Sequence, residues 1–250
     1  MKKYLLEIET RLLDIPSEYR PPMWRAENYI GAGVSKLKYL NLKIPLVRSQ
    51  FKKGFSFSNR VTEEQWLIWD YVWNRSQIFE VMLLPSYWAG SRPIEEVFAH
   101  RKLILKWVDR VDNWAHSDEL SAHYARLLEH YPSKIMPVFK TWNTSKEPWL
   151  KRQSMVGLLF YSRFRQRTPP IQIMLKFIER HINDDHYYVQ KGVGWALREC
   201  WNVYPKETFA FLKKYAGQIP PAGWTSATEK LSLKEKNILK ELRASARKGR

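Results

Sequence analysis

The sequence predicts an all-α protein, an α-solenoid of stacked antiparallel helix pairs with a concave basic face. From about residue 60 onward, the pattern indicates helices of roughly 12–18 residues joined by short connections. Prolines stand at the expected helix starts about every 20–40 residues, although no repeat is visible residue by residue. No stretch alternates apolar and polar residues with a period of two, so we expect no sheet. We expect a single domain over residues 1–250, with N-terminal helices over about 1–60 and stacked helix pairs over 61–250.

The first 60 residues predict short helices separated by proline and glycine. Residues 2–14 follow an amphipathic helical pattern that ends at Pro16. Pro21-Pro22 is expected to open a second helical stretch, which carries Tyr29. Residues 31–43 form a mixed segment in which glycines interrupt any helix.

Between residues 60 and 111, capping and breaking residues set the expected helix ends. Thr62-Glu63-Glu64-Gln65 has the spacing of a capping box before an apolar run. Pro85 and the stretch Gly90–Pro93 are expected to punctuate the segments that follow. The residues from Ile94 to Val111 predict one helix. The apolar positions that follow the capping box at helical spacing are Trp66, Trp69, Val72 and Trp73.

Prolines open most of the helices expected after a break at Asp112-Asn113. A loop over 219–223 then leads to a second capping box, Ser232-Leu233-Lys234-Glu235, and to a basic last helix. The other expected helices span His116–His130, Pro132–Trp142, Pro148 to about Arg165, Pro169 to about His181, and Pro205 to about Tyr215.

The stretch Asp184–Glu199 predicts a helix with two faces. Asp184 or Asp185 can cap its start. Gly192 and Gly194 each cost roughly 1 kcal/mol relative to alanine, which suggests that something needs the room. Gly192 would leave a gap beside Trp195; alternatively, the glycines permit close helix packing and Trp195 belongs to the core. The positions expected to face the core are Val189, Val193, Ala196, Leu197 and Cys200.

Composition indicates a polyanionic partner. The formal net charge is +17, from 42 Lys and Arg against 25 Asp and Glu, which suits DNA, RNA or an acidic membrane. The 12 tryptophans suit stacking on nucleic acid, but they also suit helix packing. Cys200 is the only cysteine, so we expect no intramolecular disulfide and no cysteine cluster for zinc. No apolar run is long enough to span a membrane, and we expect a cytoplasmic protein.

The residues Trp114 and Asp118 form the first candidate site. They are four residues apart, so on a helix they lie one above the other. One interpretation makes Asn113 or Ser117 the N-cap and Asp118 a first-turn acid that the helix dipole favours. The other interpretation makes Trp114 and Asp118 a shared site. We expect His116 to be exposed at the helix start.

Arg152 is the second candidate, because it stands on an otherwise apolar stripe between Trp149 and Met155. A half-buried arginine requires an anion, and both Asp118 and a DNA phosphate could supply it. The alternative is a surface arginine whose stem covers apolar neighbours while its charge reaches water.

Several of these motifs resemble one family. The run Val189–Glu199 is similar to a signature of the AlkD-like DNA alkylation repair glycosylases, which are all-helical HEAT-like repeat proteins. The same family carries Trp-x-x-x-Asp, which matches Trp114 and Asp118, and Trp-Leu-x-Arg, which matches Trp149–Arg152. The family has a second tryptophan in the concave surface that cradles DNA, and Trp195 matches it. Tyr29 is a weaker match to the family's N-terminal helix. The resemblance covers about residues 100–205, while the residues between Trp114 and Asp118 depart from the family pattern.

The resemblance implies a monofunctional glycosylase that excises N3- or N7-alkylated purines, such as 3-methyladenine and 7-methylguanine, in DNA base excision repair. It implies double-stranded DNA with alkylated bases as the partner, no metal, no cofactor, no membrane, no obligate protein partner and a monomeric state. DNA binding would associate the protein with the nucleoid. The residues expected to be catalytic are Asp118, Trp114, Trp195 and Arg152. The residues expected to bind DNA are Tyr29, Arg152, Lys151, Lys191 and Trp149.

Two other functions compete with this interpretation. A non-catalytic HEAT-like protein that binds DNA or RNA would need arginines and aromatic residues, but it has no need for a lone acid on a phosphate-facing surface. Asp118 there would repel DNA unless it serves chemistry or pairs with Arg152. A protein-interaction scaffold is a further possibility for a helical solenoid, and the net charge of +17 argues against it.

Overall fold

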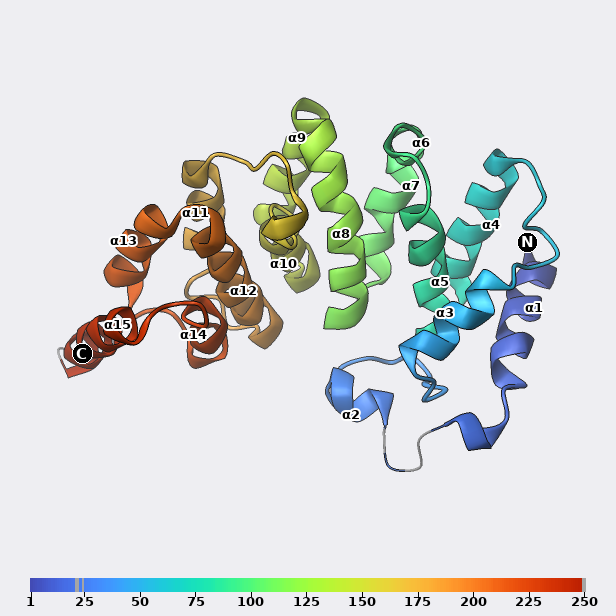
Figure 1. The fold of residues 1–250 in the computed structure, drawn as a ribbon, viewed down its shortest axis with the longest axis horizontal. Coiled ribbons are helices and arrows are strands. Elements are labelled where there is room, and N and C mark those ends of the chain that lie inside the picture. The colour runs from blue at the N-terminus through green and yellow to red at the C-terminus, as the bar shows by residue number, and fades with distance from the viewer. Residues whose placement is uncertain (21–22, 24, 249–250) are drawn as a thin grey trace. The chain divides into compact units, whose positions relative to one another are not determined.

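The computed structural model describes residues 1–20, 23 and 25–248 (Figure 1). Within these residues the chain is helical, and an isolated bridge between Lys38 and Ile78 takes the place of any strand. The α-helices are α1 Lys2–Leu13, α2 Ala26–Ile30, α3 Ile44–Lys52, α4 Thr62–Arg75, α5 Phe79–Gly90, α6 Ile94–Ala99, α7 Arg101–Lys106, α8 Trp114–His130, α9 Pro132–Asn143, α10 Pro148–Val156, α11 Ile171–Glu179, α12 Tyr187–Val203, α13 Pro205–Tyr215, α14 Pro221–Ala227 and α15 Leu233–Lys248.

The chain divides into two compact units, Met1–His123 and Tyr124–Arg250, and the division falls within α8. The prediction of an all-α fold is confirmed, whereas a single domain with a boundary near residue 60 stays a prediction. Pro21-Pro22, expected to open a helix, lies outside the described residues. Among the described helices, none is long and apolar enough to cross a membrane.

In unit 1, tryptophans of α4 form the centre of the core. Trp66, Trp69 and Trp73 are fully buried, as the helical spacing predicted. Trp73 stacks on Trp107 with the ring centroids 5.2 Å apart, and its indole N–H donates to the carbonyl of Trp107. Many of the tryptophans therefore serve helix packing, which weakens their number as a sign of nucleic-acid binding.

A buried carboxylate, Glu80, fixes the extended segment that follows α2. It accepts hydrogen bonds from the N–H groups of Leu40 and Leu42, at 3.0 and 3.2 Å. Burial raises the pKa of Glu80, and these hydrogen bonds oppose that rise. The carboxylate thereby satisfies backbone groups that have no helical partner.

In unit 2, α12 is the central helix, and α10, α11, α13 and α14 pack against it. Its contact with α14 is close because two glycines face each other. A Cβ atom on Gly194 would lie 2.1 Å from the carbonyl oxygen of Gly223, so only glycine fits there. The core positions predicted on α12 are all buried, including Cys200, and burial raises the pKa of its thiol to about 12.

Several predicted helix ends were wrong. Helix α4 begins at Thr62 with Val61 as its N-cap, so the expected capping box does not form. Pro85 lies inside α5 rather than at an end. The expected helix over Ile94–Val111 is broken at His100 into α6 and α7 and ends in a 3-10 turn. Helix α10 ends at Val156, well before Arg165.

The C-terminal part brings one confirmation and two corrections. The capping box at Ser232 forms: the N–H of Glu235 donates to the Ser232 hydroxyl, and the N–H of Ser232 donates to the Glu235 carboxylate. Of the expected loop over 219–223, residues 221–223 instead form the first turn of α14. His186, not Asp184 or Asp185, is the N-cap of α12.

Candidate functional site

The start of α8 is capped by Asn113, as one of the two interpretations predicted. Its side-chain oxygen accepts the N–H of His116 at 3.0 Å, three residues into the helix. The side chain of Asn113 is fully buried. Its NH₂ group donates to Asp112 and approaches the Nδ1 atom of His116, both at 3.0 Å. The cap therefore fixes the helix start through one amide side chain.

Asp112 joins this helix start to the segment after α2. Its carboxylate accepts the hydroxyl of Ser35 at 2.8 Å and the N–H of Lys36 at 3.0 Å. These bonds connect residues that lie more than seventy positions apart in the sequence. The short N-terminal elements and the start of α8 are thus held in one arrangement.

The expectation that His116 is exposed was wrong: its side chain is fully buried. The ring stacks on Phe79 with centroids 4.7 Å apart, and Nε2 lies 3.1 Å from the carbonyl oxygen of Phe79. Burial lowers the pKa of His116 to about 4. A neutral ring with its proton on Nε2 donates to Phe79 and accepts from Asn113 at Nδ1.

Trp114 and Tyr29 meet at the surface of unit 1. The two rings make an edge contact, with centroids 5.3 Å apart. The Trp114 indole N–H donates to the carbonyl of Ile30 at 3.1 Å, which fixes the direction of the ring. Tyr29 is 65 % exposed, and Trp114 is partly buried. Asp118 follows one helical turn later and is also partly buried, so one face of α8 presents an indole and a carboxylate.

The neighbour of Asp118, Glu119, is a second carboxyl group that the sequence did not point out. Burial raises the pKa of Glu119; Arg48 lowers it, and the charge of Asp118 raises it further. Glu119 lines a cavity of about 340 Å³ together with Arg48 and Tyr87. The raised pKa of Glu119 therefore reflects its burial beside this cavity.

In unit 2, Arg152 on α10 is buried, with 4 % of its surface exposed, so the surface interpretation was wrong. One guanidinium nitrogen donates to the carbonyl of Tyr188 at 3.1 Å. Gly192 provides the room: a Cβ atom there would lie 3.2 Å from Cγ of Arg152. The predicted gap at Gly192 therefore accommodates Arg152 and not Trp195.

Two neighbours of Arg152 on α10 also contact the start of α12. The Trp149 ring stacks on Tyr188, with centroids 5.3 Å apart. Lys151 forms an ion pair with Asp184 at 2.7 Å. Burial alone would raise the pKa of Asp184, but the hydrogen bonds from Lys151 and from the N–H of His186 hold it below its usual value. Both candidate DNA-binding residues thus have a structural contact within unit 2.

Trp195 and Lys191 lie on α12 and are partly buried. The Trp195 ring stacks on Phe160 with centroids 5.1 Å apart and an interplanar angle of 18°. The guanidinium carbon of Arg198 also lies over the Trp195 ring, 5.2 Å from its centroid. The ammonium of Lys191 is 5.9 Å from the Tyr187 ring. Trp195 is therefore a supported but accessible indole rather than a core residue.

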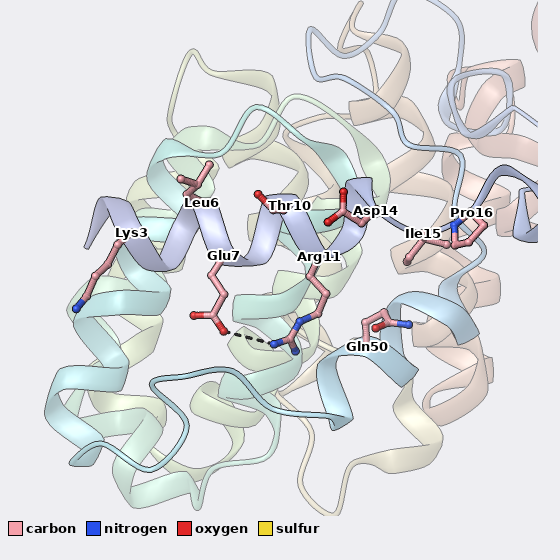
Figure 2. A pocket seen from close by; sticks show the side chains of 9 residues that line it. All are labelled: Lys3, Leu6, Glu7, Thr10, Arg11, Asp14, Ile15, Pro16 and Gln50. Atoms are coloured by element: carbon pink, nitrogen blue, oxygen red, sulfur yellow. Dashed lines mark hydrogen bonds and ion pairs between the residues drawn. The ribbon is translucent and has the colours of Figure 1, made fainter.

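Unit 1 contains another cavity, larger than the one beside Glu119, but none of the candidate site residues lines it. It measures about 710 Å³ and lies along α1 beside Gln50 of α3 (Figure 2). Glu7 and Arg11 on its wall form an ion pair at 3.4 Å (Figure 2). Glu7 also accepts the N–H of Ser56 at 2.8 Å, and Arg11 donates to the carbonyl of Gly54. These charges join α1 to residues 54–56. Across the described residues, no group of three or more His, Cys, Asp or Glu could hold a metal ion.

The fold belongs to the class of all-helical HEAT-like repeat proteins, and the sequence identifies the family within it. The sequence model for DNA alkylation repair enzymes matches residues 24–231. The chain therefore belongs to the DNA alkylation repair enzyme family.

Solved structures agree with this fold. One, a "predicted DNA alkylation repair enzyme" from Enterococcus faecalis, gives a TM-score of 0.65 at 14% identity and covers 83% of this chain and 93% of its own. The crystal structure of AlkD2 from Streptococcus mutans gives a TM-score of 0.54 at 16% identity and covers 97% of each chain. At such identities the likeness shows the fold alone. No curated protein sequence matches this chain significantly.

Proposed function

We propose that this protein is a monofunctional DNA glycosylase that hydrolyses the N-glycosidic bond of N3- or N7-alkylated purines. Membership of the DNA alkylation repair family supports a role in alkylation repair. The observation that carries the more specific proposal is the face of α8, where an indole and a carboxylate follow each other by one turn. A chain with a net charge of +17 has little electrostatic reason to place an acid beside DNA unless that acid serves chemistry.

The chemistry requires only a few groups. Alkylation at N3 or N7 gives the purine a formal positive charge, so it leaves as a neutral base with the electron pair of the bond to C1′. The sugar then develops positive charge. We assign Asp118 to stabilise that charge and to orient the water whose oxygen bonds to C1′ and whose proton is released. Such a mechanism needs neither a metal nor a cofactor.

The aromatic and basic residues complete the proposal. Trp114 and Trp195 would present electron-rich ring faces to the cationic sugar and strand. Arg152 would bind a phosphate, since its guanidinium is planar and always charged. We further propose that the protein acts as a monomer on double-stranded DNA in the cytoplasm. The additional DNA contacts that we propose are Tyr29, Trp149, Lys151 and Lys191.

The test compares base release by wild type, Asp118→Asn and the control Asp109→Asn. Methylated duplex DNA is incubated with each protein, and 7-methylguanine and 3-methyladenine are measured by chromatography. Asp109 is an exposed acid of the same unit, in the 3-10 turn before α8. We expect Asp118→Asn to lower the rate by about 10²–10³-fold, the range for losing one group that stabilises transition-state charge. Asp109→Asn should release bases at the wild-type rate.

Binding to unmodified duplex, measured by fluorescence anisotropy over a range of salt, separates chemistry from affinity. Asp118→Asn should bind at least as well as wild type, because it removes a negative charge. Salt-dependent binding without base release by wild type would make the protein a non-catalytic binder. Full base release by Asp118→Asn would remove Asp118 from the mechanism.

A further inference from the structure

The segment between α10 and α11 contains a loop, Phe160–Phe164, with an unusual backbone. Tyr161 has φ of 47° and ψ of 79°, a left-handed conformation that a bulky residue rarely adopts. Such a conformation costs free energy and persists where the surroundings impose it. Ser162–Phe164 then form a short 3-10 turn. The loop is therefore held in one shape by its contacts with the rest of unit 2.

The contact that holds it is a buried carboxylate of α12, Glu199. One of its oxygens accepts both the N–H and the hydroxyl of Ser162, at 2.8 and 2.7 Å. Asn202 donates to the same oxygen at 3.3 Å, and Arg198 donates to the other oxygen at 3.2 Å. Glu199 is only 4 % exposed. Because charge-assisted hydrogen bonds in a buried site are strong, they fix the loop on α12 one turn after Trp195.

The fixed loop presents aromatic rings to solvent. Phe164 is 62 % exposed and Tyr161 is 38 % exposed. The guanidinium carbon of Arg163 lies 4.7 Å from the Phe164 ring and 5.2 Å from the Tyr161 ring. Because the Phe164 side chain is mostly exposed, it contributes little to the core. A residue on a mobile loop would lose conformational entropy on binding. Because the loop backbone is fixed, the exposed ring of Phe164 enters another surface at a smaller entropic cost.

The charge of the segment identifies the kind of surface. Residues 157–170 contain three arginines and no Asp or Glu. Arg165 is paired with Glu129 at 3.1 Å, while Arg163 and Arg167 are exposed. Basic residues beside exposed aromatic rings suit a polyanion with flat, stackable groups. Nucleic acid has both properties, and an apolar protein partner would not require the arginines.

We propose that the loop Phe160–Phe164 is a wedge that enters duplex DNA beside the lesion. Phe164 inserts between neighbouring bases, and Arg163 binds a phosphate of the same strand. Phe160 stacks on Trp195 and so connects the wedge to that indole. Glu199 is a positioning residue that holds the loop through Ser162. The inference rests on the proposed action on DNA and adds an element that unstacks the strand.

The experiment uses a duplex with a tetrahydrofuran abasic analogue and the fluorescent base 2-aminopurine next to it. Unstacking raises the fluorescence of 2-aminopurine. We expect wild type to raise the signal and Phe164→Ala to abolish most of that rise, with binding weakened about tenfold. The control is Leu67→Ala, which removes an exposed apolar side chain, 54 % exposed, from α4 in unit 1. It should behave as wild type.

Two further variants test the parts of the proposal. Arg163→Gln should lower the slope of log affinity against log salt by about one, as expected for one lost phosphate contact. Ser162→Ala removes one hydrogen bond to Glu199 and leaves the exposed rings in place. It should reduce the fluorescence rise partially and increase trypsin cleavage after Arg163, because the loop is less fixed.

An unchanged fluorescence rise and affinity in Phe164→Ala would overturn the wedge, whatever the base-release assay shows. The proposed function can fail separately. If wild type releases no methylated base, the glycosylase proposal fails, while the fluorescence assay still reports whether Phe164 unstacks DNA. Phe164 is exposed, so the melting temperature of Phe164→Ala should equal that of wild type, and any loss of signal reflects the DNA contact.

Discussion

Trp114 and Trp195 are both partly buried indoles on the helices of the two candidate sites, but they are held by different means. In unit 1, the Trp114 N–H donates to the carbonyl of Ile30, and the ring makes an edge contact with the ring of Tyr29. In unit 2, the Trp195 ring lies flat against Phe160. The orientation of Trp114 is set by a directional hydrogen bond, whereas that of Trp195 is set by stacking on the Phe160 ring.

The helices beneath them differ in the same way. The start of α8 is fixed by polar side chains, namely Asn113, Asp112 and the neutral His116. Helix α12 is fixed by close packing at two glycines: Gly194 lets α14 approach, and Gly192 leaves room for the Arg152 side chain. A region held by polar groups should respond to loss of a cap and to protonation. The stability of a region held by close packing should change when a single methyl group is added.

The largest effect is expected from Gly194→Ala. The added Cβ would lie 2.1 Å from the Gly223 carbonyl oxygen and 2.7 Å from its Cα, both backbone atoms that cannot rotate away. Overpacking of this kind costs 1–3 kcal/mol or more, so we expect a loss of about 3 kcal/mol in the free energy of unfolding. Urea denaturation followed by circular dichroism measures it. Wild-type stability would show that α14 does not pack against α12 in this way.

The second effect is a pH dependence from His116 in unit 1. Its pKa is about 4 in the folded protein and about 6.5 in the unfolded chain, so between these values only the unfolded chain binds the proton. The stabilising contribution is therefore complete above pH 6.5 and is lost as the pH falls to 4. We expect wild type to lose about 3 kcal/mol more than His116→Gln over this range.

The informative quantity is the difference in the free energy of unfolding between wild type and His116→Gln, measured by urea denaturation at several pH values. Glu80 is also buried in unit 1, and its raised pKa changes stability with the opposite sign in both proteins. Burial lowers the pKa of His181 in unit 2, which adds to the acid sensitivity of both proteins equally. Parallel curves for wild type and His116→Gln would mean that His116 titrates normally in the folded protein.

A smaller effect is expected at the cap of α8. Asn113→Ala removes the acceptor for the N–H of His116, and loss of an N-cap costs about 1 kcal/mol. The matched variant is Ser232→Ala, which removes the exposed cap of α15. Asn113→Ala should also slow base release, because the cap fixes the turn that carries Trp114 and Asp118. Equal base release in both variants would reduce Asn113 to a purely local role.

Much of the fold followed from helical spacing and proline positions, because these act locally. The core positions of α4 and α12 and the capping box at Ser232 were predicted from residues close together in sequence. The errors lay at helix ends and breaks. Pro85 stays inside α5, and the capping box at Thr62 gives way to a helix that begins there with Val61 as its N-cap. Residue propensities are weak guides to the exact residue at which a helix begins or ends.

The candidate site was predictable in its residue types but not in its supports. The spacing of Trp114 and Asp118 placed both on one helix face, and the resemblance added Arg152 and Trp195. The sequence did not show that His116 is buried, that Glu199 fixes Ser162, or that Gly223 faces Gly194. Each of these joins segments about thirty residues apart or more, and a single sequence carries no signal of that pairing.

Gly192→Ala should have the smallest effect on stability and separates the two glycines of α12. Its Cβ would lie 3.2 Å from Cγ of Arg152, a contact that the long side chain can relieve by a small shift. The cost is offset by the higher helix propensity of alanine, roughly 1 kcal/mol, so the free energy of unfolding should change by less than about 1 kcal/mol. Arg152 would still be displaced, and we expect base release to fall by about tenfold, because misplaced positioning groups slow catalysis.

The assays are urea denaturation and release of 7-methylguanine, side by side with Gly194→Ala. If Gly192→Ala unfolds as readily as Gly194→Ala, both glycines serve packing alone; if it is stable and fully active, the position of Arg152 does not matter for the reaction.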